Sequence, residues 1–242
     1  MASNPDSVRL AAAVTATKVV DLSHPMYEGM PFWPGGVPFT VTRLRDYPQG
    51  CQYHKFEFAE NTGTHVDAPS HFVPGKRSID RIPLEHLVVP AVMVEVASQA
   101  ATDPDYRLSA ADLHAWEAMH GRIADSCLVL VSTGWYKRFA DPDRYLNRGQ
   151  DGKMHFPGLS ADAAHLLVQR GVAGVGIDTP SIDHGPSRDF VAHKILLAAD
   201  IYQIENLANL DALPVLGATA VVGVLNVQGG SEAQARVFGL VP

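Results

Sequence analysis

Short apolar runs rich in valine recur along the chain and predict a sheet. Many of their apolar residues stand on consecutive positions, which indicates strands that are buried on both faces. Gly, Pro or Asp bounds these runs, as is usual between strands of a globular domain. The predicted strands are residues 18–23, 53–59, 91–96, 127–132, 174–177, 218–227 and 235–241.

Two segments carry helix signals at both ends. Ser109, followed by Asp112 at the third helical position, forms a variant of the capping box, and this helix is expected to end at Gly121. Ser160 opens the second helix, and Gly171 ends it. The second helix runs directly into the next predicted strand, so the two form an αβ unit.

The remaining segments fit one domain. A third helix is expected after Asp189 and includes His193. Residues 136–158 are polar and rich in Gly and Pro, which predicts a long surface excursion near a pocket or an interface. We therefore expect an N-terminal arm over residues 1–17 and a single α/β domain over residues 18–242. That domain would have mixed β-sheet layers with flanking helices.

Composition and charge narrow the choice of partners. The chain has 242 residues, of which 46% are hydrophobic, and this is enough for one sizeable core. The net charge of −7, without a basic run, argues against nucleic acid as a partner. No apolar run approaches the roughly 20 residues that a membrane span needs. Cys51 and Cys127 are too few for a disulfide framework, so we expect a cytoplasmic protein with Cys127 in its core.

Candidate chemistry gathers between residues 61 and 71. His65 and Asp67 are two positions apart, so in an extended chain their side chains project to the same side, with Cα atoms about 6.6 Å apart. Asn61 would be about 13 Å from His65 in a straight strand, but Gly63 can bend the chain between them. His71 follows a proline, beyond the end of the strand. The segment could hold a cation.

Spacing alone leaves a second interpretation open. Thr64 and Asp67 could organise a turn, and the two histidines, His65 and His71, could be ordinary polar groups with satisfied hydrogen bonds. The string His-x-Asp is short and common. Four other histidines, in or beside the predicted helices, are expected on the surface: His86, His114, His120 and His165.

A wider pattern favours the metal interpretation. The segment resembles His-x-Gly-Thr-His-x-Asp-x-Pro-x-His, the pattern of the cyclase family of metal-dependent hydrolases, which includes bacterial N-formylkynurenine formamidases and isatin hydrolases. The matching residues are Gly63, Thr64, His65, Asp67, Pro69 and His71. Other segments resemble the family in its order, at residues 21–25, 33–35, 156–158, 176–181 and 205–207. The resemblance covers nearly the whole chain from residue 18.

The resemblance implies a ligand set and one departure from it. Position 61, His65 and Asp67 would hold a first metal, and His193 and Glu205 would join Asp67 at a second. The family usually has His at the first position, where this chain has Asn61. An amide oxygen is a harder and weaker ligand than imidazole, so we expect Mn²⁺ rather than Zn²⁺. One or two ions remain open.

The resemblance also implies the chemistry. A divalent cation lowers the pKa of water to about 7 and can polarise a carbonyl group. His71 would act as the general base and then as the acid towards the leaving nitrogen. Trp33, Phe32 and Ser181 are the predicted substrate contacts, whereas Phe39 is expected in the core. Neither cysteine has the context of a nucleophile.

Three functions are compared. Hydrolysis of isatin to isatinate leads, because the insert at 135–158 and the helix at 115–121 resemble isatin hydrolases. N-formylkynurenine formamidase is the alternative, favoured by His193 with Glu205. A non-catalytic protein that binds a metal or a metabolite is the third, and Asn61 is its support. We expect a homodimer or homotetramer, as is common for soluble enzymes, with the N-terminal arm suited to an interface.

Overall fold

The computed structural model describes residues 13–14 and 17–242, so most of the predicted N-terminal arm lies outside the described residues. The strands are β1 (Lys18–Asp21), β2 (Thr40–Arg45), β3 (Tyr53–Glu57), β4 (His65–Asp67), β5 (Val88–Glu95), β6 (Arg107–Leu108), β7 (Leu128–Ser132), β8 (Gly158–Leu159), β9 (Gly174–Ile177), β10 (Tyr202–Glu205), β11 (Ala218–Val224) and β12 (Glu232–Val241). The helices are α2 (Ala97–Thr102), α3 (Ala110–His120), α4 (Pro142–Leu146), α5 (Ala161–Arg170) and α6 (Val191–Ala198). Each predicted strand and helix is therefore confirmed, within a few residues at its ends.

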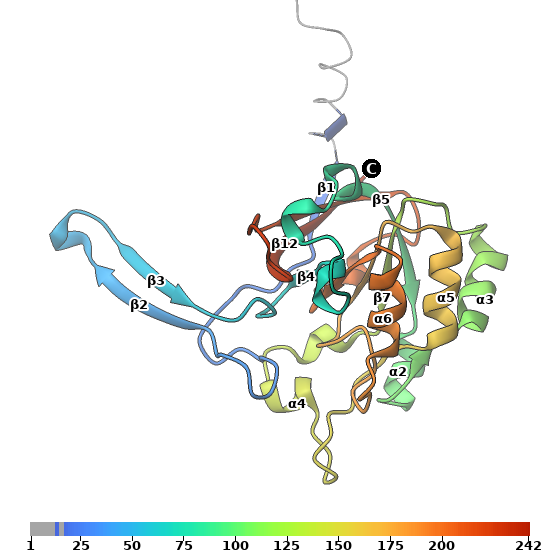
Figure 1. Ribbon diagram of the computed structural model, residues 1–242, viewed down its shortest axis with the longest axis horizontal. Helices are drawn as coiled ribbons and strands as arrows, with labels where there is room; N and C mark the ends of the chain where they lie inside the picture. The colour runs from blue at the N-terminus through green and yellow to red at the C-terminus, as the bar shows by residue number, and fades with distance from the viewer. Residues whose placement is uncertain (1–12, 15–16) are drawn as a thin grey trace, which may run out of the picture.

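One mixed sheet closes on itself and forms the centre of the molecule (Figure 1). Its order is β1-β12-β11-β5-β7-β9-β10-β4, and the additional pairing of β4 with β12 closes it. Strands β5, β7, β9 and β10 run parallel to one another, while the pairings of β11, β12 and β4 are antiparallel. The expected α/β domain with a mixed sheet and flanking helices is confirmed.

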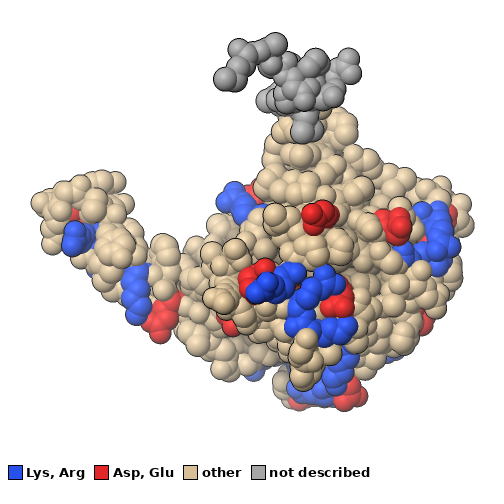
Figure 2. Space-filling model, turned by 45° about the horizontal axis from the view of Figure 1, so that its top comes forward, with Lys and Arg blue, Asp and Glu red and all other residues tan. Residues whose placement is uncertain are grey.

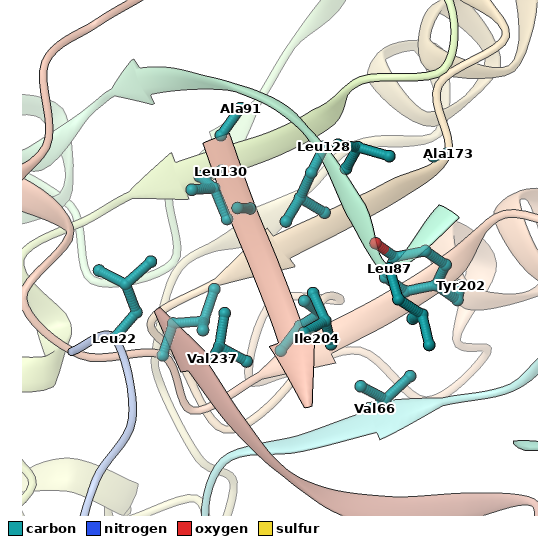
Figure 3. Packing of buried hydrophobic residues seen from close by; sticks show 14 of the residues in the cluster. Leu22, Val66, Leu87, Ala91, Leu128, Leu130, Ala173, Tyr202, Ile204 and Val237 are labelled. Carbon is teal, nitrogen blue, oxygen red and sulfur yellow. The ribbon is translucent and has the colours of Figure 1, made fainter. Parts of the chain in front are cut away.

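The consecutive apolar residues of the central strands face two cores. In β7, Leu128 and Leu130 point into the closed sheet, where they join Ile204 and Val66 (Figure 3). The alternate residues Val129 and Val131 face the helices, as the two-residue period of a strand requires. Burial on both faces explains why these strands lack a polar face.

Helices α3, α5 and α6 cover the outer face of the parallel strands (Figure 1). The capping box at the start of α3 is present, because Ser109 accepts from the backbone of Asp112 and Asp112 accepts from the backbone of Ser109. Gly121 and Gly171 end α3 and α5, as predicted. The third helix, α6, carries His193 on its buried side. The contact of α6 with β10 brings this histidine beside Glu205, the last residue of that strand.

The segment 136–158 runs over the surface, as predicted, but it is also anchored by buried side chains that were not predicted. Its Tyr145 and Phe156 are fully buried and pack with Trp135 and Phe139 in a third apolar cluster. The polar composition of the segment gave no sign of these two residues. A few buried side chains are enough to hold such a segment against the domain. The segment does border pockets, through Tyr145 and through residues of the hairpin that follows α4.

Strands β2 and β3 form a ribbon that projects from the body of the molecule (Figure 1). Almost all of its residues are exposed, and it carries charges of both signs (Figure 2). Elsewhere, Cys127 is buried as expected, and Cys51 is exposed. Among the helices of the described residues, none is long and apolar enough to cross a membrane.

Candidate metal centre and active site

The register of β4 between β10 and β12 gathers four polar side chains. His65 lies opposite Glu205 of β10, and Asp67 lies opposite Glu232 of β12. Residues directly opposite each other in an antiparallel pair place their side chains on the same face. Val66 points into the core of the closed sheet, so the four polar side chains lie on the outer face.

Asp67 and Glu205 each bridge two histidines. The Nε2 atom of His65 is 3.3 Å from Oδ1 of Asp67 and 3.4 Å from Oε2 of Glu205. The Nε2 atom of His193, which α6 supplies, is 3.3 Å from Oδ2 of Asp67 and 3.1 Å from Oε1 of Glu205. All four residues are buried. Two carboxylates shared in this way form two adjacent positions that suit a cation.

The second nitrogen of each imidazole has a fixed partner. Nδ1 of His65 is 2.8 Å from the carbonyl oxygen of Gly63, and Nδ1 of His193 is 2.7 Å from Oδ2 of Asp183. A carbonyl oxygen can only accept, so Nδ1 of His65 donates, and Nε2 is the nitrogen that faces the two carboxylates. Partners of this kind orient histidine ligands in metal sites.

Orphaned polar atoms support the fit of a divalent cation. Nε2 of His65 and both carboxylate oxygens of Asp67 are buried and have no hydrogen-bond partner among the described residues. His65, Asp67 and Glu205 bring one ligand atom each within 4.8 Å of one another. Imidazole with carboxylates suits Mn²⁺ and Zn²⁺. Buried polar atoms without partners are costly, and a cation would satisfy them.

The electrostatics of the cluster agree with a surplus of negative charge. Burial lowers the pKa of His65 and of His193, but the carboxylates around them outweigh it and raise both pKa values well above the ordinary range. Burial raises the pKa of Asp67, and His193 and His65 more than reverse this, so that its pKa is lowered. Each imidazole therefore carries an extra proton in the absence of a metal, and a bound divalent cation would replace that proton.

Glu232 is a site residue that the sequence reasoning missed. Its Oε1 atom lies 3.7 Å from Nε2 of His65, and its Oε2 atom lies 3.7 Å from Nδ1 of His71. Burial, and next the charge of Asp67, raises its pKa to about 8. The backbone nitrogen of Glu232 donates to Glu60, which holds the start of β12 in place. The predicted strand began three residues too late, at Ala235, and so excluded this carboxylate.

His71 lies at the open edge of the cluster. It ends a short 3-10 turn (Pro69–His71) directly after β4, and its side chain is 26% exposed, whereas that of His65 is 1% exposed. Asp67, His71 and Glu232 form a second group whose ligand atoms lie within 4.8 Å of one another. The exposure allows His71 to meet a substrate that the buried histidines cannot reach directly.

The other predicted site residues line the pockets around the cluster. Trp33, Asn61 and Ser181 share a pocket of about 160 Å³ with Asp67 and with His71 and Glu232. Phe32 lines a smaller neighbouring pocket, together with Trp33 and Asn61. Asn61 therefore lies beside the candidate metal centre, in the lining of both pockets.

Two further aromatic residues of this pocket were not predicted. Phe72 and Phe190 line it together with Trp33, and the ring centroids of Phe72 and Phe190 are 5.4 Å apart. Phe72 directly follows His71 of the motif, and Phe190 directly precedes α6, which carries His193. Their closeness in sequence to these two histidines was the only signal that could have identified them. His24, by contrast, stacks on Phe139 at 3.6 Å, and burial lowers its pKa to about 4.

Comparisons with known proteins agree with this site. A family model described as putative cyclase matches residues 20–184. Isatin hydrolase of Roseibium aggregatum is 34% identical over 191 residues, which are 76% of this chain and 72% of that protein. Kynurenine formamidase of Salinibacter ruber is 28% identical over 222 residues, which are 90% of this chain and 95% of that protein.

Solved structures are similar over the full length. An isatin hydrolase bound to the product analogue thioisatinate has a TM-score of 0.93 and 27% identity, and covers 100% of both chains. Isatin hydrolase A from Ralstonia solanacearum has a TM-score of 0.90 and 32% identity, also with 100% of both chains. The likeness therefore includes the segment 136–158 as well as the sheet.

Proposed function

Because the chain belongs to the putative cyclase family, we propose that it is a metal-dependent hydrolase of small aromatic amides, with isatin as its substrate and isatinate as the product. One observation carries the proposal: Asp67 and Glu205 each present one oxygen to His65 and the other to His193 in a buried cluster. Burial of four ionisable side chains costs free energy, and ordinary hydrogen bonds would stabilise the fold at a lower cost. The arrangement therefore points to a functional site.

The proposed metal ligands are His65, Asp67, His193 and Glu205, with Asn61 as a further oxygen donor beside them. Mn²⁺ is favoured and Zn²⁺ is the alternative, in one or two positions, because the donor set is rich in carboxylate oxygen. A divalent cation held there would supply an activated water as nucleophile and would polarise the amide carbonyl.

His71 is proposed to move the protons of the reaction. Hydrolysis joins a water oxygen to the carbonyl carbon and breaks the carbon–nitrogen bond, so a proton must leave the water and another must reach the nitrogen. His71 is the partly exposed histidine of the cluster and can perform both transfers. Glu232, whose Oε2 atom lies 3.7 Å from Nδ1 of His71, is the carboxyl group beside this ring.

The aromatic pocket is proposed to hold the substrate ring. Trp33, Phe72 and Phe190 supply flat apolar surfaces above the cluster, and stacked or tilted aromatic pairs stabilise such complexes by about 0.5–1.5 kcal/mol beyond area burial. Ser181 lines the same pocket and offers a hydroxyl group for a carbonyl oxygen. Phe32 would extend the wall on the side of Trp33.

N-formylkynurenine is the second candidate substrate, because kynurenine formamidases are among the relatives and because both His193 and Glu205 are present. The test is an assay of isatin and of N-formylkynurenine, each with Mn²⁺ and with Zn²⁺. We expect turnover of isatin that depends on the added metal. Turnover of N-formylkynurenine alone would replace isatin by the second candidate, and no turnover of either would contradict hydrolysis of these amides.

We also propose that the protein is a homodimer or homotetramer. The β2–β3 ribbon exposes Leu44, Tyr53 and Phe56, and an isolated two-stranded ribbon is marginally stable in water. A second copy of the chain would bury these side chains. Light scattering of the purified protein, with Phe56→Glu as the disrupting variant, tests this: a monomer in the unmodified protein would contradict it.

A further inference from the structure

A second pocket lies behind the aromatic wall of the candidate active site. Trp33 and Phe190 line the pocket that contains Asp67 and His71, and the same two residues line a neighbouring cavity of about 180 Å³. Their ring centroids are 6.4 Å apart, with an interplanar angle of 50°. One aromatic partition therefore separates the two pockets.

The second pocket is cationic. Arg148, Lys153 and Arg188 line it, and no Asp or Glu of the described residues does so. The ion pair recorded for Lys153 joins its Nζ atom to Asp151 at 3.7 Å, while neither arginine forms an ion pair within the described part of the chain. Two arginines without ion pairs among the described residues, beside one lysine, therefore give this pocket a local positive charge in a chain whose net charge is −7.

The hairpin after α4 and the loop before α6 bring these cations together. Arg148 pairs with Met154 in an isolated antiparallel bridge, which closes the hairpin that projects beside α4 in Figure 1. Gly185 lies so close to this hairpin that an added Cβ would be 2.5 Å from the carbonyl oxygen of Met154. The pocket is thus built from two segments in contact, rather than from one mobile loop.

The partition itself is held under backbone strain. Phe190 has a φ of +48°, and a bulky residue rarely adopts this left-handed conformation, which costs on the order of 1–3 kcal/mol. Its carbonyl oxygen accepts from the backbone nitrogen of Lys194, and the next turn of α6 is fixed by Asp183. In this conformation the Phe190 ring lines both the pocket beside the metal cluster and the pocket with the cations.

From these features we infer that the cationic pocket binds a carboxylate carried by the aromatic ligand of the active site. This inference rests on the proposed function. The guanidinium groups of Arg148 and Arg188 can bind a carboxylate through two parallel hydrogen bonds, which an ammonium group cannot do as specifically. The aromatic ring of the ligand would then lie in the pocket beside the metal cluster, and its carboxylate would lie in the cationic pocket.

Two sources could supply this carboxylate. Opening of a cyclic amide with water creates one carboxylate and one amine, so the product is an anion although the substrate is neutral. A substrate such as N-formylkynurenine carries its own carboxylate on a flexible chain. In the first case the pocket receives the product as it leaves, and in the second it positions the substrate.

The double variant Arg148→Gln/Arg188→Gln tests the inference in the metal-loaded protein. In the product arm, inhibition of isatin hydrolysis by isatinate should weaken about tenfold, while KM and kcat for neutral isatin stay within about twofold. In the substrate arm, KM for N-formylkynurenine should rise about tenfold, while KM for formanilide, a neutral formamide, stays unchanged. A change in one arm alone identifies the source, and no change in either arm overturns the inference.

A binding measurement separates this inference from the proposed function. Phenylglyoxylate, an aromatic ring with a carboxylate, is titrated calorimetrically into the unmodified protein and into the double variant. Weaker binding in the double variant supports the pocket even if no amide is hydrolysed. Arg81→Gln/Arg122→Gln removes the same charge from exposed positions outside both pockets and is the matched control. Equal weakening in this control would assign the effect to net charge and would also overturn the inference.

Discussion

Asp183 and His193 form a buried pair in which Oδ2 of Asp183 lies 2.7 Å from Nδ1 of His193. The same carboxylate accepts from the backbone nitrogens of Ala192 and His193 in the first turn of α6. Burial raises the pKa of Asp183, but the hydrogen bond to His193 more than offsets it and lowers the pKa. One carboxylate therefore fixes both the helix and the ring that the helix delivers to the metal cluster.

Asp183→Asn should lower the affinity for Mn²⁺ by about 10- to 100-fold, as is usual when the partner of a histidine ligand loses its charge. The amide oxygen can still accept from the backbone of α6, so the fold should persist. Calorimetric titration with Mn²⁺ measures the affinity. Asp162→Asn, at an exposed helix start, is the control and should bind Mn²⁺ as the unmodified protein does. Equal losses in the two variants would contradict this role for Asp183.

Tyr145→Phe should weaken the hydrogen bonds that hold the ring of His65 in its orientation. The hydroxyl group of Tyr145 donates to Oδ1 of Asn206 at 2.8 Å, and Nδ2 of Asn206 donates to the carbonyl oxygen of Gly63 that orients His65. Removal of the hydroxyl leaves a buried acceptor without this partner, so the free energy of unfolding should fall by about 1–3 kcal/mol. Urea denaturation measures this, with the exposed Tyr47→Phe as the control. Unchanged stability would show that the chain of hydrogen bonds has no energetic weight.

The fold could be predicted from the sequence wherever a signal is local. Valine-rich runs predicted the central strands, and Ser109, Ser160 and the glycines that follow predicted the ends of α3 and α5. The strand β4 has three residues, too few for a period, and its position between β10 and β12 depends on pairings with residues far away in the chain. Sequence patterns do not carry such pairings.

The candidate site divides in the same way. His65, Asp67 and His71 stand together in one motif and could be proposed from it. Glu232 faces Asp67 only because β12 pairs with β4. A single glutamate at the start of a strand has no recognisable sequence pattern, so only the register of the strand pairing could identify Glu232 as a site residue. Phe190 was missed for a similar reason, since its role depends on an unusual φ before α6.

His71→Ala should reduce turnover of the amide substrate by about 100-fold or more while the metal content stays the same, because the variant removes proton transfer but not the buried ligands. Steady-state rates and elemental analysis are measured on the same preparation. The exposed His114→Ala on α3 is the control and should keep full activity. Survival of activity in His71→Ala would remove His71 from its proposed role, and loss of metal would make it a ligand instead.

Glu117 and Arg170 join α3 to α5, with both donor–acceptor distances at 2.7 Å. The hydrogen bonds from Arg170 lower the pKa of Glu117 from 4.5 to about 2. A carboxyl group with a lowered pKa stabilises the folded state above its unfolded pKa, and this stability is lost as pH falls through the folded pKa. Glu117→Gln should therefore cost on the order of 2 kcal/mol at neutral pH.

The difference between Glu117→Gln and the unmodified protein should shrink as pH falls from about 4.5 towards 2. Urea denaturation at a series of pH values measures it. Glu57→Gln, which removes an exposed partner of Lys55, should change stability by less than about 1 kcal/mol at any pH. A constant difference across the acidic range would contradict the assignment of this stability to the charge of Glu117.

Elemental analysis of the desalted protein after loading with Mn²⁺ tests the central claim most directly, with Asp67→Asn treated in parallel. Asp67 presents an oxygen to each of the two buried histidines, so its charge should be required at either position. We predict one or two tightly held ions per chain in the unmodified protein and a clear loss in Asp67→Asn. No stoichiometric metal in the unmodified protein, or equal metal in both, would contradict a metal centre built on this carboxylate.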